Sequence, residues 1–539
     1  MTTTAAIDFE GMLTFLQQSA SYPHHPRRVE IRQTHASVVA IVPPYVYKIK
    51  KRVDLGFLDF RSLADRKANC EREVRLNSRL CAELYLGVVP ITQQPDGGGL
   101  AFGAGGEVVD YALQMKQLPD GFFLDELLAK GWVTPSVLEP VLARLKDFYD
   151  QQPPDPTLAH HGDIAHLKTN SDENFLTLRQ FAGDIIHPVA LEAIRQFTEQ
   201  FYEKRRPLLE KRTRGNRIKD GHGDLRLEHI HAQDGKVCIY DCIEFNDRFR
   251  YLDVASDLAF LTMDFDFHHR PDLARHVTER MAGLLNDPEM KQLMDFYQCY
   301  RACVRAKVER IRSGEPEVPA AERQQSHERA VRYGQLALRY ATLGSVGAVI
   351  MVGGRIASGK STLARQLAQL LGAEYLASDV VRKEGAGLPL YERTPPETKA
   401  VLYAAAQKDH VYENLLGAAL AGARQGQICL VDATFGRLTN RALFTEAFTR
   451  EGIPYYFLEA QASEATLRQR LRQRDQQPQV VSDARLDDFD RLNQAYQAPT
   501  EIPGAHLLAI STETSPEEGL SACLRQLRAA NQDVVSPVG

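Results

Sequence analysis

Apolar and polar positions alternate in blocks through the last third of the chain. Short apolar runs of strand length are separated by longer stretches in which apolar residues recur at helical spacing. Strands that alternate with helices in this way are typical of a parallel sheet in an α/β fold. The predicted strands are Ala348–Val352, Ile428–Val431 and Tyr455–Leu458, and the predicted helices include Thr362–Leu371, Thr398–Arg424 and Ser463–Arg474.

The first third of the chain has a different pattern. Two apolar-rich runs joined at Pro43-Pro44 predict a β-hairpin, a helix and two more strands follow, and beyond Phe122 the pattern is mostly helical except near 222–245. A small β-rich lobe before a larger helical lobe predicts an α+β, bilobal, kinase-like layout. The predicted elements are the strands Val38–Val42, Tyr45–Lys50, Gly87–Gln93 and Val108–Lys116 and the helix Leu63–Leu84.

The clearest break in these patterns is Arg312–Pro319, which carries one glycine and two prolines. A helix over Ala320–Thr342 follows and leads into the C-terminal pattern. We therefore expect two domains, 1–340 and 343–539. Within the first, the small lobe spans about 25–118, the large lobe about 119–312 and a linker helix about 320–342.

Composition argues against a nucleic-acid-binding, membrane or secreted protein. The chain of 539 residues is 44% hydrophobic and 25% charged with a net charge of −5, which is typical of a soluble globular protein and argues weakly against general nucleic-acid binding. No apolar run approaches the length of a membrane span, and the start lacks the features of a secretion signal. We expect a cytoplasmic protein with no membrane partner, and the oligomeric state stays open.

The eight cysteines form no C-x-x-C pair. Two pairs have C-x-x-x-C spacing, but no second ligand pair accompanies either. Reduced structural thiols are the favoured interpretation, and a zinc site is the alternative.

A glycine-rich loop between a predicted strand and a predicted helix is the strongest chemical signal. It fits G-x-x-x-x-G-K-[ST], in which backbone amides wrap the β-phosphate, Lys360 reaches the β- and γ-phosphates, and Ser361 holds Mg²⁺. The expected cofactors are ATP and Mg²⁺, and the motif does not distinguish ATP from GTP. The nucleotide-binding residues are Gly354, Arg355, Ile356, Ala357, Ser358, Gly359, Lys360, Ser361 and Thr362.

A second signal lies near residue 222. His222–His229 contains His-Gly-Asp, an Asp234-Gly235 turn follows, and a short apolar run ends in Asp241. Two short strands would present Asp224 and Asp241 at one edge. Phosphoryl transfer uses such a pair, since one carboxylate orients and deprotonates the attacking hydroxyl and the other holds Mg²⁺.

These motifs resemble the aminoglycoside-phosphotransferase-like kinases over roughly residues 25–310. The family motif H-G-D-L-x-x-x-N appears at 222–229, and its hydrophobic-Asp strand appears at 239–241. The resemblance implies that Asp224 is the catalytic base and Asp241 the main metal ligand. His229 stands in the place of the usual Asn, which makes it the second candidate ligand. Because imidazole suits Mg²⁺ poorly, either metal binding rests on Asp241 and Glu244, or this lobe is weak or inactive.

The same resemblance implies a nucleotide site in the small lobe. Lys48 would contact the α- and β-phosphates, Glu73 would be its ion-pair partner with Glu71 as the alternative, and Met115 would lie in the hinge (114–118) that receives the adenine. The family's glycine-rich loop is missing at 34–37. Asp253 and Asp257 resemble residues that support the catalytic loop.

Carboxylates and arginines that follow the P-loop favour a kinase over a motor. Asp379 ends a short predicted strand and would take the proton of the acceptor hydroxyl, although a helix N-cap is its alternative role. The arrangement is similar to P-loop kinases of the gluconate-kinase, zeta-toxin and polynucleotide-kinase type over about 347–505. The similarity implies that Arg382 is an acceptor-side phosphate or substrate contact and that Asp432 is a Walker-B-like carboxylate, which acts through Mg²⁺-bound water or on the acceptor. It also implies that Arg470 and Arg474 are lid arginines.

The order of the two parts resembles a bacterial fusion family, in which an aminoglycoside-phosphotransferase-like domain precedes a P-loop kinase domain. The leading hypothesis is an ATP-dependent phosphotransferase acting on a hydroxyl of a small metabolite, with the P-loop domain as the surer catalyst. The alternatives are a 5′-polynucleotide kinase, which the mild net charge does not favour, and a nucleotide-sensing regulator whose first domain is disabled at His229.

Overall fold

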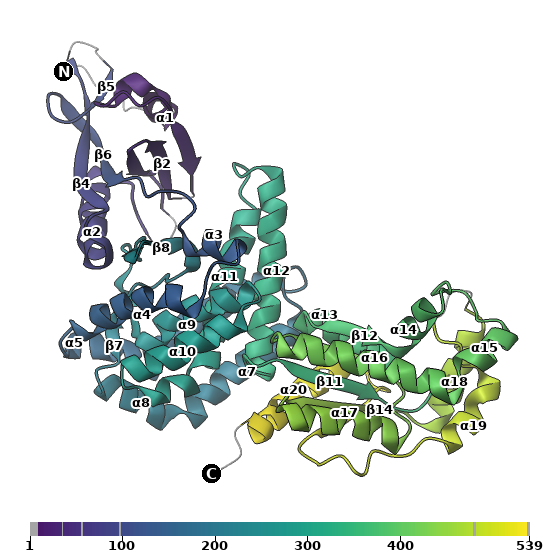
Figure 1. Cartoon of the computed structure of the whole chain (residues 1–539). Coiled ribbons are helices and arrows are strands. Elements are labelled where there is room, and N and C mark those ends of the chain that lie inside the picture. Colours follow the sequence, from purple (N-terminus) through teal and green to yellow (C-terminus); the bar gives the residue numbers. More distant parts are fainter. Residues whose placement is uncertain (1–8, 35, 55–57, 96–98, 478–480, 536–539) are drawn as a thin grey trace. The chain divides into compact units, whose positions relative to one another are not determined.

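The structure of the protein is a computed structural model that describes residues 9–34, 36–54, 58–95, 99–477 and 481–535. The chain forms two compact units, and Figure 1 labels their helices and strands. The first unit comprises 1–166, 207–264 and 276–291, and the second comprises 167–206, 265–275 and 292–539. The boundary expected near residue 340 falls inside the second unit, and it stays a prediction about separately folding domains.

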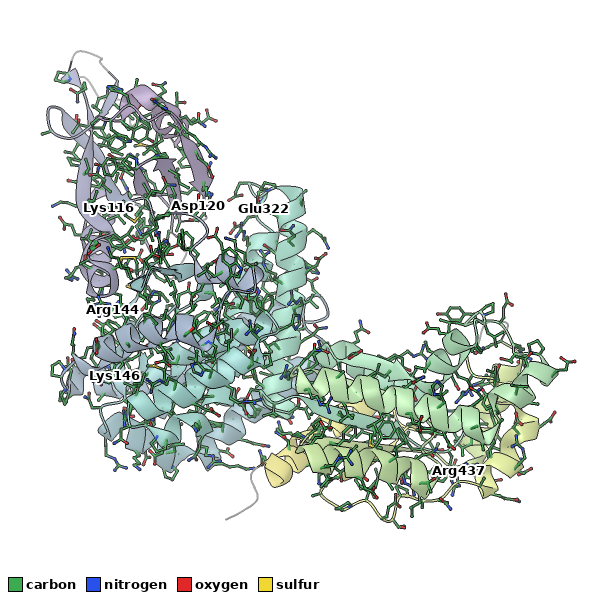
Figure 2. All side chains as sticks on the ribbon, in the orientation of Figure 1. Lys116, Asp120, Arg144, Lys146, Glu322 and Arg437 are labelled. Carbon is green, nitrogen blue, oxygen red and sulfur yellow. A yellow bond between two sulfur atoms is a disulfide. The ribbon has the colours of Figure 1, made fainter. Side chains whose placement is uncertain are left out.

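The first unit opens with a six-stranded antiparallel sheet in the order β1-β2-β3-β6-β4-β5. The hairpin predicted at Pro43-Pro44 is present as β2 and β3, and β6 ends at Lys116, which Figure 2 labels. The strands are β1 (Glu30–Gln33), β2 (Ser37–Val42), β3 (Tyr45–Lys50), β4 (Tyr85–Gln93), β5 (Leu100–Phe102) and β6 (Glu107–Lys116).

Strand β3 separates an apolar face from a charged one. Tyr47 and Ile49 point into an aromatic core that helix α1 (Phe9–Gln17) helps to build. Lys48 and Lys50 alternate with them and therefore lie on the opposite face. Helix α2 (Leu63–Cys81) covers that face, so β3 presents two lysines toward one helix.

The rest of the first unit is mainly helical and carries two small antiparallel pairs. The β8–β9 hairpin turns at Asp234-Gly235, as the sequence predicts. The other pair joins β7 to β10. The strands are β7 (Ile218–Asp220), β8 (Ile230–Gln233), β9 (Lys236–Ile239) and β10 (Tyr251–Asp253), and the helices that lie in this part of the chain are α3 (Leu124–Ala129), α4 (Pro135–Asp150), α5 (Pro156–Ala159), α8 (Arg206–Arg214), α9 (Val254–Phe267) and α10 (Pro271–Leu284).

The second unit contains a five-stranded parallel sheet in the order β12-β13-β11-β14-β15. Its buried strands read as continuous apolar runs, as expected for a parallel sheet covered on both faces. This confirms the predicted α/β fold. The strands are β11 (Ala348–Gly353), β12 (Glu374–Ala377), β13 (Ile428–Asp432), β14 (Tyr455–Gln461) and β15 (Leu507–Ser511).

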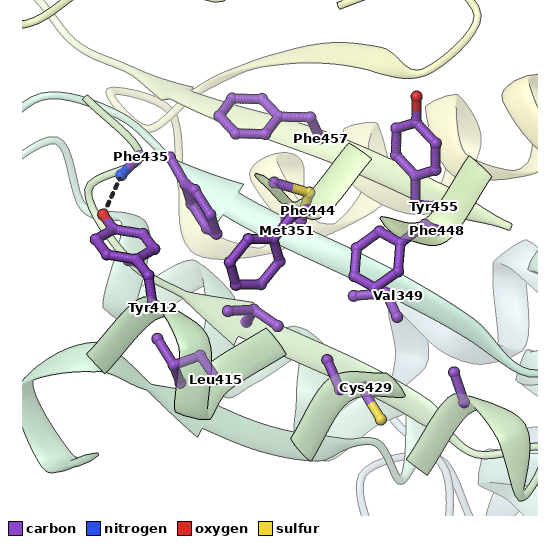
Figure 3. Close-up of a cluster of buried hydrophobic side chains, with 14 of the residues drawn as sticks. Val349, Met351, Tyr412, Leu415, Cys429, Phe435, Phe444, Phe448, Tyr455 and Phe457 are labelled. Carbon is purple, nitrogen blue, oxygen red and sulfur yellow. Dashed lines mark hydrogen bonds between the residues drawn. The ribbon is translucent and has the colours of Figure 1, made fainter. Parts of the chain in front are cut away.

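Helices cover both faces of this sheet. One face is covered by α16, through Tyr412 and Leu415, and by α17, through Phe444 and Phe448 (Figure 3). Helices α13 and α20 pack against each other and contact strands of the same sheet, including β13 and β15. The helix predicted over 398–424 is two helices that break at Tyr403-Ala404. The helices that lie in this part of the chain are α6 (Ile164–Gln180), α7 (Pro188–Lys204), α11 (Met294–Ser313), α12 (Ala320–Thr342), α13 (Lys360–Leu371), α14 (Ser378–Gly385), α15 (Pro396–Leu402), α16 (Ala405–Arg424), α17 (Leu438–Glu451), α18 (Glu464–Asp475), α19 (Phe489–Gln494) and α20 (Pro516–Val535).

No helix among the described residues has the length and apolar character needed to cross a membrane.

The prediction that all eight cysteines are reduced thiols is wrong for one pair, because Cys81 and Cys238 form a disulfide. Folding brings the end of α2 beside β9 across 157 residues of sequence, a proximity that cysteine spacing does not reveal. The remaining six cysteines are free and buried.

Candidate functional site

The P-loop connects β11 to α13 in the second unit. Its backbone turns sharply, with positive φ angles at Gly354 (142°), Ala357 (60°) and Gly359 (88°). A Cβ atom on residue 354 would lie 2.6 Å from the carbonyl oxygen of Ala460, so glycine is required there. Within the described part of the chain, the amides of Ala357 and Gly359 have no acceptor. The amides of Lys360 and Ser361, the first two residues of α13, have no acceptor there either, whereas those of Thr362 and Leu363 donate to the carbonyl of Gly359 at 3.1 Å. These donors can therefore bind phosphate oxygens.

The remaining P-loop residues anchor or flank this cradle. Ile356 is buried in an apolar cluster with two leucines of α18. The Arg355 guanidinium lies 5.9 Å from the centre of the Tyr496 ring. Ser361 and Thr362 belong to the first turn of α13, and Ser361 as a Mg²⁺ ligand stays a prediction from the motif.

Arg470 of α18 braces the loop from the side of β15. Its Nη1 donates to Thr512 Oγ1 (2.9 Å) and to the carbonyl of Ala357 (3.4 Å), and its Nη2 donates to the carbonyl of Thr512 (2.6 Å). The Thr512 hydroxyl donates to the carbonyl of Ser358 at 2.6 Å. Arg470 is therefore bonded to the loop backbone, while the role of lid arginine stays a prediction. Sequence reasoning missed Thr512, because a threonine about 150 residues past the loop carries no local signal.

Asp432 ends β13 directly beside the loop, since it pairs in register with Val352. The side chain is buried, Oδ2 accepts a hydrogen bond from the Tyr375 hydroxyl (2.7 Å), and Oδ1 is buried with no partner among the described residues. The Ser358 hydroxyl is also buried and unpartnered there. A buried, unsatisfied carboxylate oxygen needs a partner. Mg²⁺ in nucleotide sites takes one or two protein oxygens together with waters and phosphates, so Asp432 and Ser361 fit that ion.

Asp379 and Arg382 form a hydrogen-bonded pair, but Asp379 lies in a helix and not at the end of a strand as the sequence predicts. Strand β12 ends at Ala377, and Asp379 belongs to the first turn of α14. The prediction of a strand-end carboxylate is therefore wrong by two residues. The alternative N-cap role is also wrong, because Ala377 is the N-cap residue. Arg382 Nη1 donates to Asp379 Oδ1 at 2.5 Å, and its guanidinium lies 4.5 Å from the centre of the Tyr403 ring.

Arg474 lies within electrostatic range of this pair. Burial lowers the pKa of Arg474, and the charge of Asp379 opposes that shift. No hydrogen bond or ion pair ties the Arg474 side chain to another described residue. Arg472, which projects from the same helix, is exposed. Helix α18 therefore brings Arg470 to the loop and Arg474 within electrostatic range of Asp379, and their role as lid arginines stays a prediction.

Asp483 ties the segment around α15 to the segment that follows α18. This buried carboxylate accepts hydrogen bonds from the amide and hydroxyl of Thr394 (3.1 and 2.7 Å) and from the hydroxyl of Tyr403 (3.3 Å). Lys399 Nζ donates to the Asp483 carbonyl at 2.9 Å. Because Tyr403 also stacks on Arg382, Asp483 positions a side chain that contacts the site.

The first unit holds a second cluster of charges. Lys48 Nζ lies 2.9 Å from Glu73 Oε1 and 2.8 Å from Asp241 Oδ1. The structure thus brings together three residues predicted for one nucleotide site. Burial alone would lower the pKa of Lys48, but Asp241 and Glu73 raise it well above its usual value. Glu71 is half exposed and pairs with Lys67 at 3.2 Å, which leaves Glu73 as the partner of Lys48.

A second lysine that sequence reasoning missed completes this cluster. Lys50 Nζ lies 2.5 Å from Glu73 Oε2 and 2.6 Å from Glu244 Oε1, and all three side chains are buried. Burial raises the pKa of Glu244, although Lys50 opposes that shift. The alternation of β3 is the signal that could have found Lys50, because it shares a face with Lys48.

The His-Gly-Asp loop is held by Asp257. Asp257 accepts hydrogen bonds from the amides of His222 (2.7 Å) and Gly223 (2.9 Å), which agrees with the supporting role expected for it. Asp224, the predicted base, is partly exposed and lies 3.2 Å from Arg226 Nε.

His229 lies close to the predicted metal ligand Asp241, with 3.7 Å between Nε2 and Oδ2. Its Nδ1 is 2.8 Å from the carbonyl of Asp224 and its Nε2 is 3.2 Å from Arg226 Nη2. Both ring nitrogens are thus engaged by protein atoms, so His229 as a metal ligand stays a prediction that this geometry does not favour. Among the residues described, no group of three or more His, Cys, Asp and Glu side chains could hold a metal ion.

Met115, the predicted hinge residue, lies near the end of β6. It pairs in register with Val46 and Tyr85 on either side, and its side chain packs on an apolar cluster that includes Leu113. The segment then leaves the sheet, and the Gln117 amide donates to the carbonyl of Pro44 at 2.8 Å.

Comparison with known proteins gives matches of three kinds, to a family model, to solved structures and to curated relatives. A family model described as an AAA domain matches residues 349–499. Solved structures similar to part of the chain include a gluconokinase from Sinorhizobium meliloti 1021 (15% identity, TM-score 0.26, 36% of this chain and 98% of that chain). Another is the Mycobacterium tuberculosis APS kinase CysC in complex with AMPPNP and APS (20% identity, TM-score 0.26, 34% of this chain and 98% of that chain).

Two curated mycobacterial proteins match most of the chain. Uncharacterized protein Rv2004c of Mycobacterium tuberculosis (strain ATCC 25618 / H37Rv) is 32% identical over 416 residues, which cover 77% of this chain and 80% of that protein. Uncharacterized protein Mb2027c of Mycobacterium bovis gives the same values. With that identity over four fifths of their length, the chain belongs to the same protein family as these two mycobacterial proteins.

Proposed function

We propose that the protein is an ATP-dependent phosphotransferase, which transfers the γ-phosphoryl group of ATP to a hydroxyl of a small metabolite at the P-loop site. The observation that carries the proposal is the convergence of three features at the carboxyl edge of one parallel sheet. The P-loop follows β11, Asp432 ends β13 with an unsatisfied buried oxygen, and the Asp379–Arg382 pair follows β12. Ligands of open parallel sheets bind at this edge.

Each residue has a defined task in the proposed transfer. The loop amides and Lys360 would hold the β- and γ-phosphates, and Arg474 would neutralise the charge of the transferring group. Asp379 would accept the proton of the acceptor hydroxyl while Arg382 keeps the carboxylate oriented. Mg²⁺, held by Ser361 and through water by Asp432, would supply additional charge neutralisation on the phosphates.

The experiment compares Lys360→Ala and Asp379→Asn with the matched control Arg472→Ala, an exposed arginine of α18. Transfer from γ-labelled ATP is measured over sugars, sugar acids, nucleosides and 5′-hydroxyl oligonucleotides, and nucleotide binding is measured separately. Lys360→Ala is expected to lose nucleotide binding and transfer at the P-loop site. Asp379→Asn is expected to bind nucleotide normally and to lose about 10²–10⁴-fold in transfer rate, while the control keeps both.

The outcomes also separate the rival functions. Labelling of oligonucleotides alone would identify a 5′-polynucleotide kinase. Binding of ATP without transfer to any acceptor would identify a nucleotide-sensing regulator and would end the phosphotransferase proposal. A parallel titration with GTP determines the nucleotide preference.

A second phosphotransfer site in the first unit is favoured by the contacts of Lys48 with Glu73 and Asp241, two residues predicted for one nucleotide site. We propose that this aminoglycoside-phosphotransferase-like unit binds ATP, with Asp224 as base and Asp241 as metal ligand. Asp224→Ala should remove a transfer activity that survives in Lys360→Ala. If Asp224→Ala changes no transfer activity while the first unit still binds ATP, the two-kinase idea fails.

The proposal includes a cytoplasmic location. The Cys81–Cys238 disulfide argues against it, because structural disulfides are rare in reducing compartments. Thiol labelling of the protein, denatured directly from cells, tests this point: eight reactive thiols support the cytoplasm, and six contradict it.

A further inference from the structure

Two cations of the second unit, one of them beside the Asp379–Arg382 pair, have no anionic partner among the described residues. Lys408, at the start of α16, has its Nζ 5.9 Å from the centre of the Tyr403 ring, over which the Arg382 guanidinium also lies. Arg437, labelled in Figure 2, directly precedes α17. Among the residues that the structure describes, neither Lys408 nor Arg437 pairs with a carboxylate. Lys408 is half-buried and Arg437 is exposed.

One hydrogen bond joins the elements that carry these two cations. Tyr412 follows Lys408 by one helical turn, and its hydroxyl accepts the amide N–H of Phe435 at 3.1 Å (Figure 3). Phe435 precedes Arg437 by two residues in the loop after β13. The pKa of Lys408 is lowered by burial and by the charge of Arg437, which agrees with this proximity.

The neighbouring cations are already neutralised. Arg382 pairs with Asp379 at 2.5 Å, and Arg491 pairs with Asp488 at 2.8 Å. The Arg474 side chain also has no partner among the described residues, but it is assigned to the transferring phosphoryl group. The positive charge left for the acceptor therefore belongs to Lys408 and Arg437. Neither residue lies on the P-loop or on α18, the elements that supply cations to the nucleotide phosphates. Lys408 lies over the same Tyr403 ring as Arg382, the partner of the proposed base Asp379, and Arg437 is near enough to Lys408 for its charge to lower the pKa of that lysine.

We propose that the acceptor of this phosphotransferase carries an anionic group, a phosphate or a carboxylate, and that Lys408 and Arg437 bind it. The inference rests on the proposed function of the P-loop site and adds the substrate class to it. Two cations from two adjacent elements suit one small anionic group, which a lysine and an arginine can hold by charge-assisted hydrogen bonds.

A small anion explains this arrangement better than a nucleic acid does. A polynucleotide is bound through many phosphates, each met by a lysine or arginine along a track. Among the described cations that act on Lys408, Arg382 and Arg491 are occupied by carboxylates, and Arg437 alone remains beside it. The chain as a whole carries a net charge of −5, which does not favour a polyanion.

The test measures ATP-dependent transfer to matched acceptor pairs, glycerol against glycerol 3-phosphate and glucose against gluconate, together with a 5′-hydroxyl oligonucleotide. The variants are Lys408→Ala/Arg437→Ala and a control, Arg450→Ala, an exposed arginine at the other end of α17. We expect the wild type to use the anionic member of a pair with a KM at least tenfold lower. The double variant should raise that KM at least tenfold, and leave the KM for ATP and for the neutral member within twofold.

Three results would overturn the inference while the proposed function survives. They are transfer that favours the neutral members, transfer to the oligonucleotide alone, and an unchanged KM for the anionic acceptor in the double variant. Transfer to none of the acceptors, with ATP bound, would instead count against the proposed function. In that case, thermal shifts of the AMPPNP-bound protein with glycerol 3-phosphate and gluconate decide the anion site: a stabilisation that the double variant loses supports it, and no stabilisation overturns it.

Discussion

Replacing Lys50 with methionine removes the one cation that contacts both Glu73 and Glu244 in the first unit. The three side chains are 2%, 1% and 8% exposed, respectively. Glu73 would keep Lys48, at 2.9 Å, but Glu244 would lose its only ion pair among the described residues and stay buried. Removal of one partner from a buried pair costs about 3–5 kcal/mol, because the other charge is left uncompensated.

The free energy of unfolding of the first unit should therefore fall by about 3–5 kcal/mol in Lys50→Met. For a unit of this size, 1 kcal/mol corresponds to about 2–4 °C, so its thermal transition should fall by roughly 6–20 °C. Differential scanning calorimetry of the full chain resolves this transition from that of the second unit, which should not move. The control Lys67→Met removes an exposed pair with Glu71 and should cost less than about 1 kcal/mol.

The double variant Lys50→Met/Glu244→Gln separates charge from packing. If the uncompensated carboxylate causes the loss, neutralising Glu244 should restore at least half of it. A shift below 2 °C in Lys50→Met, or a double variant no more stable than the single one, would refute the reasoning.

Three further predictions concern other parts of the molecule. Burial raises the pKa of Asp266 from 3.8 to about 6, so the folded state binds this proton more tightly and loses stability as pH rises from about 4 to 6. Asp266→Asn should therefore stabilise the second unit at pH 7.5 by about 1–3 kcal/mol. An unchanged free energy of unfolding in urea would contradict this prediction. Thr512→Val removes the bonds to Ser358 and Arg470 and should weaken binding of a fluorescent ATP analogue about tenfold, whereas an unchanged affinity would show that the brace is dispensable. Cys81→Ser should lower the stability of the first unit by about 2–4 kcal/mol, and dithiothreitol should do the same to the wild type; an unaffected wild type would mean that the disulfide is absent in solution.

Local patterns predicted the elements and the P-loop well. The hairpin at Pro43-Pro44, the helix at 320–342 and the strands of the parallel sheet are each specified by residues close in sequence, and the structure contains them. The P-loop is recognisable for the same reason, since its eight residues are contiguous in the sequence. Asp379 was misplaced by two residues because a short strand that runs directly into a helix leaves no turn signal between them.

The contacts that complete the sites could not be predicted in this way. Thr512 reaches the P-loop, and Tyr375 reaches Asp432, only after the sheet has formed. The disulfide joins residues 157 positions apart. Lys50 differs from these, because its place on the charged face of β3 follows from strand alternation. Its two glutamate partners could not be predicted from that alternation.

The most direct test of the central claim is single-turnover transfer of label from γ-labelled ATP to an acceptor by the wild type and by Asp379→Asn, with nucleotide saturating both. The account predicts transfer by the wild type, an unchanged affinity for ATP in Asp379→Asn, and a loss of about 10²–10⁴-fold in its transfer rate. Equal transfer rates, or hydrolysis of ATP by the wild type with no labelled acceptor, would contradict it.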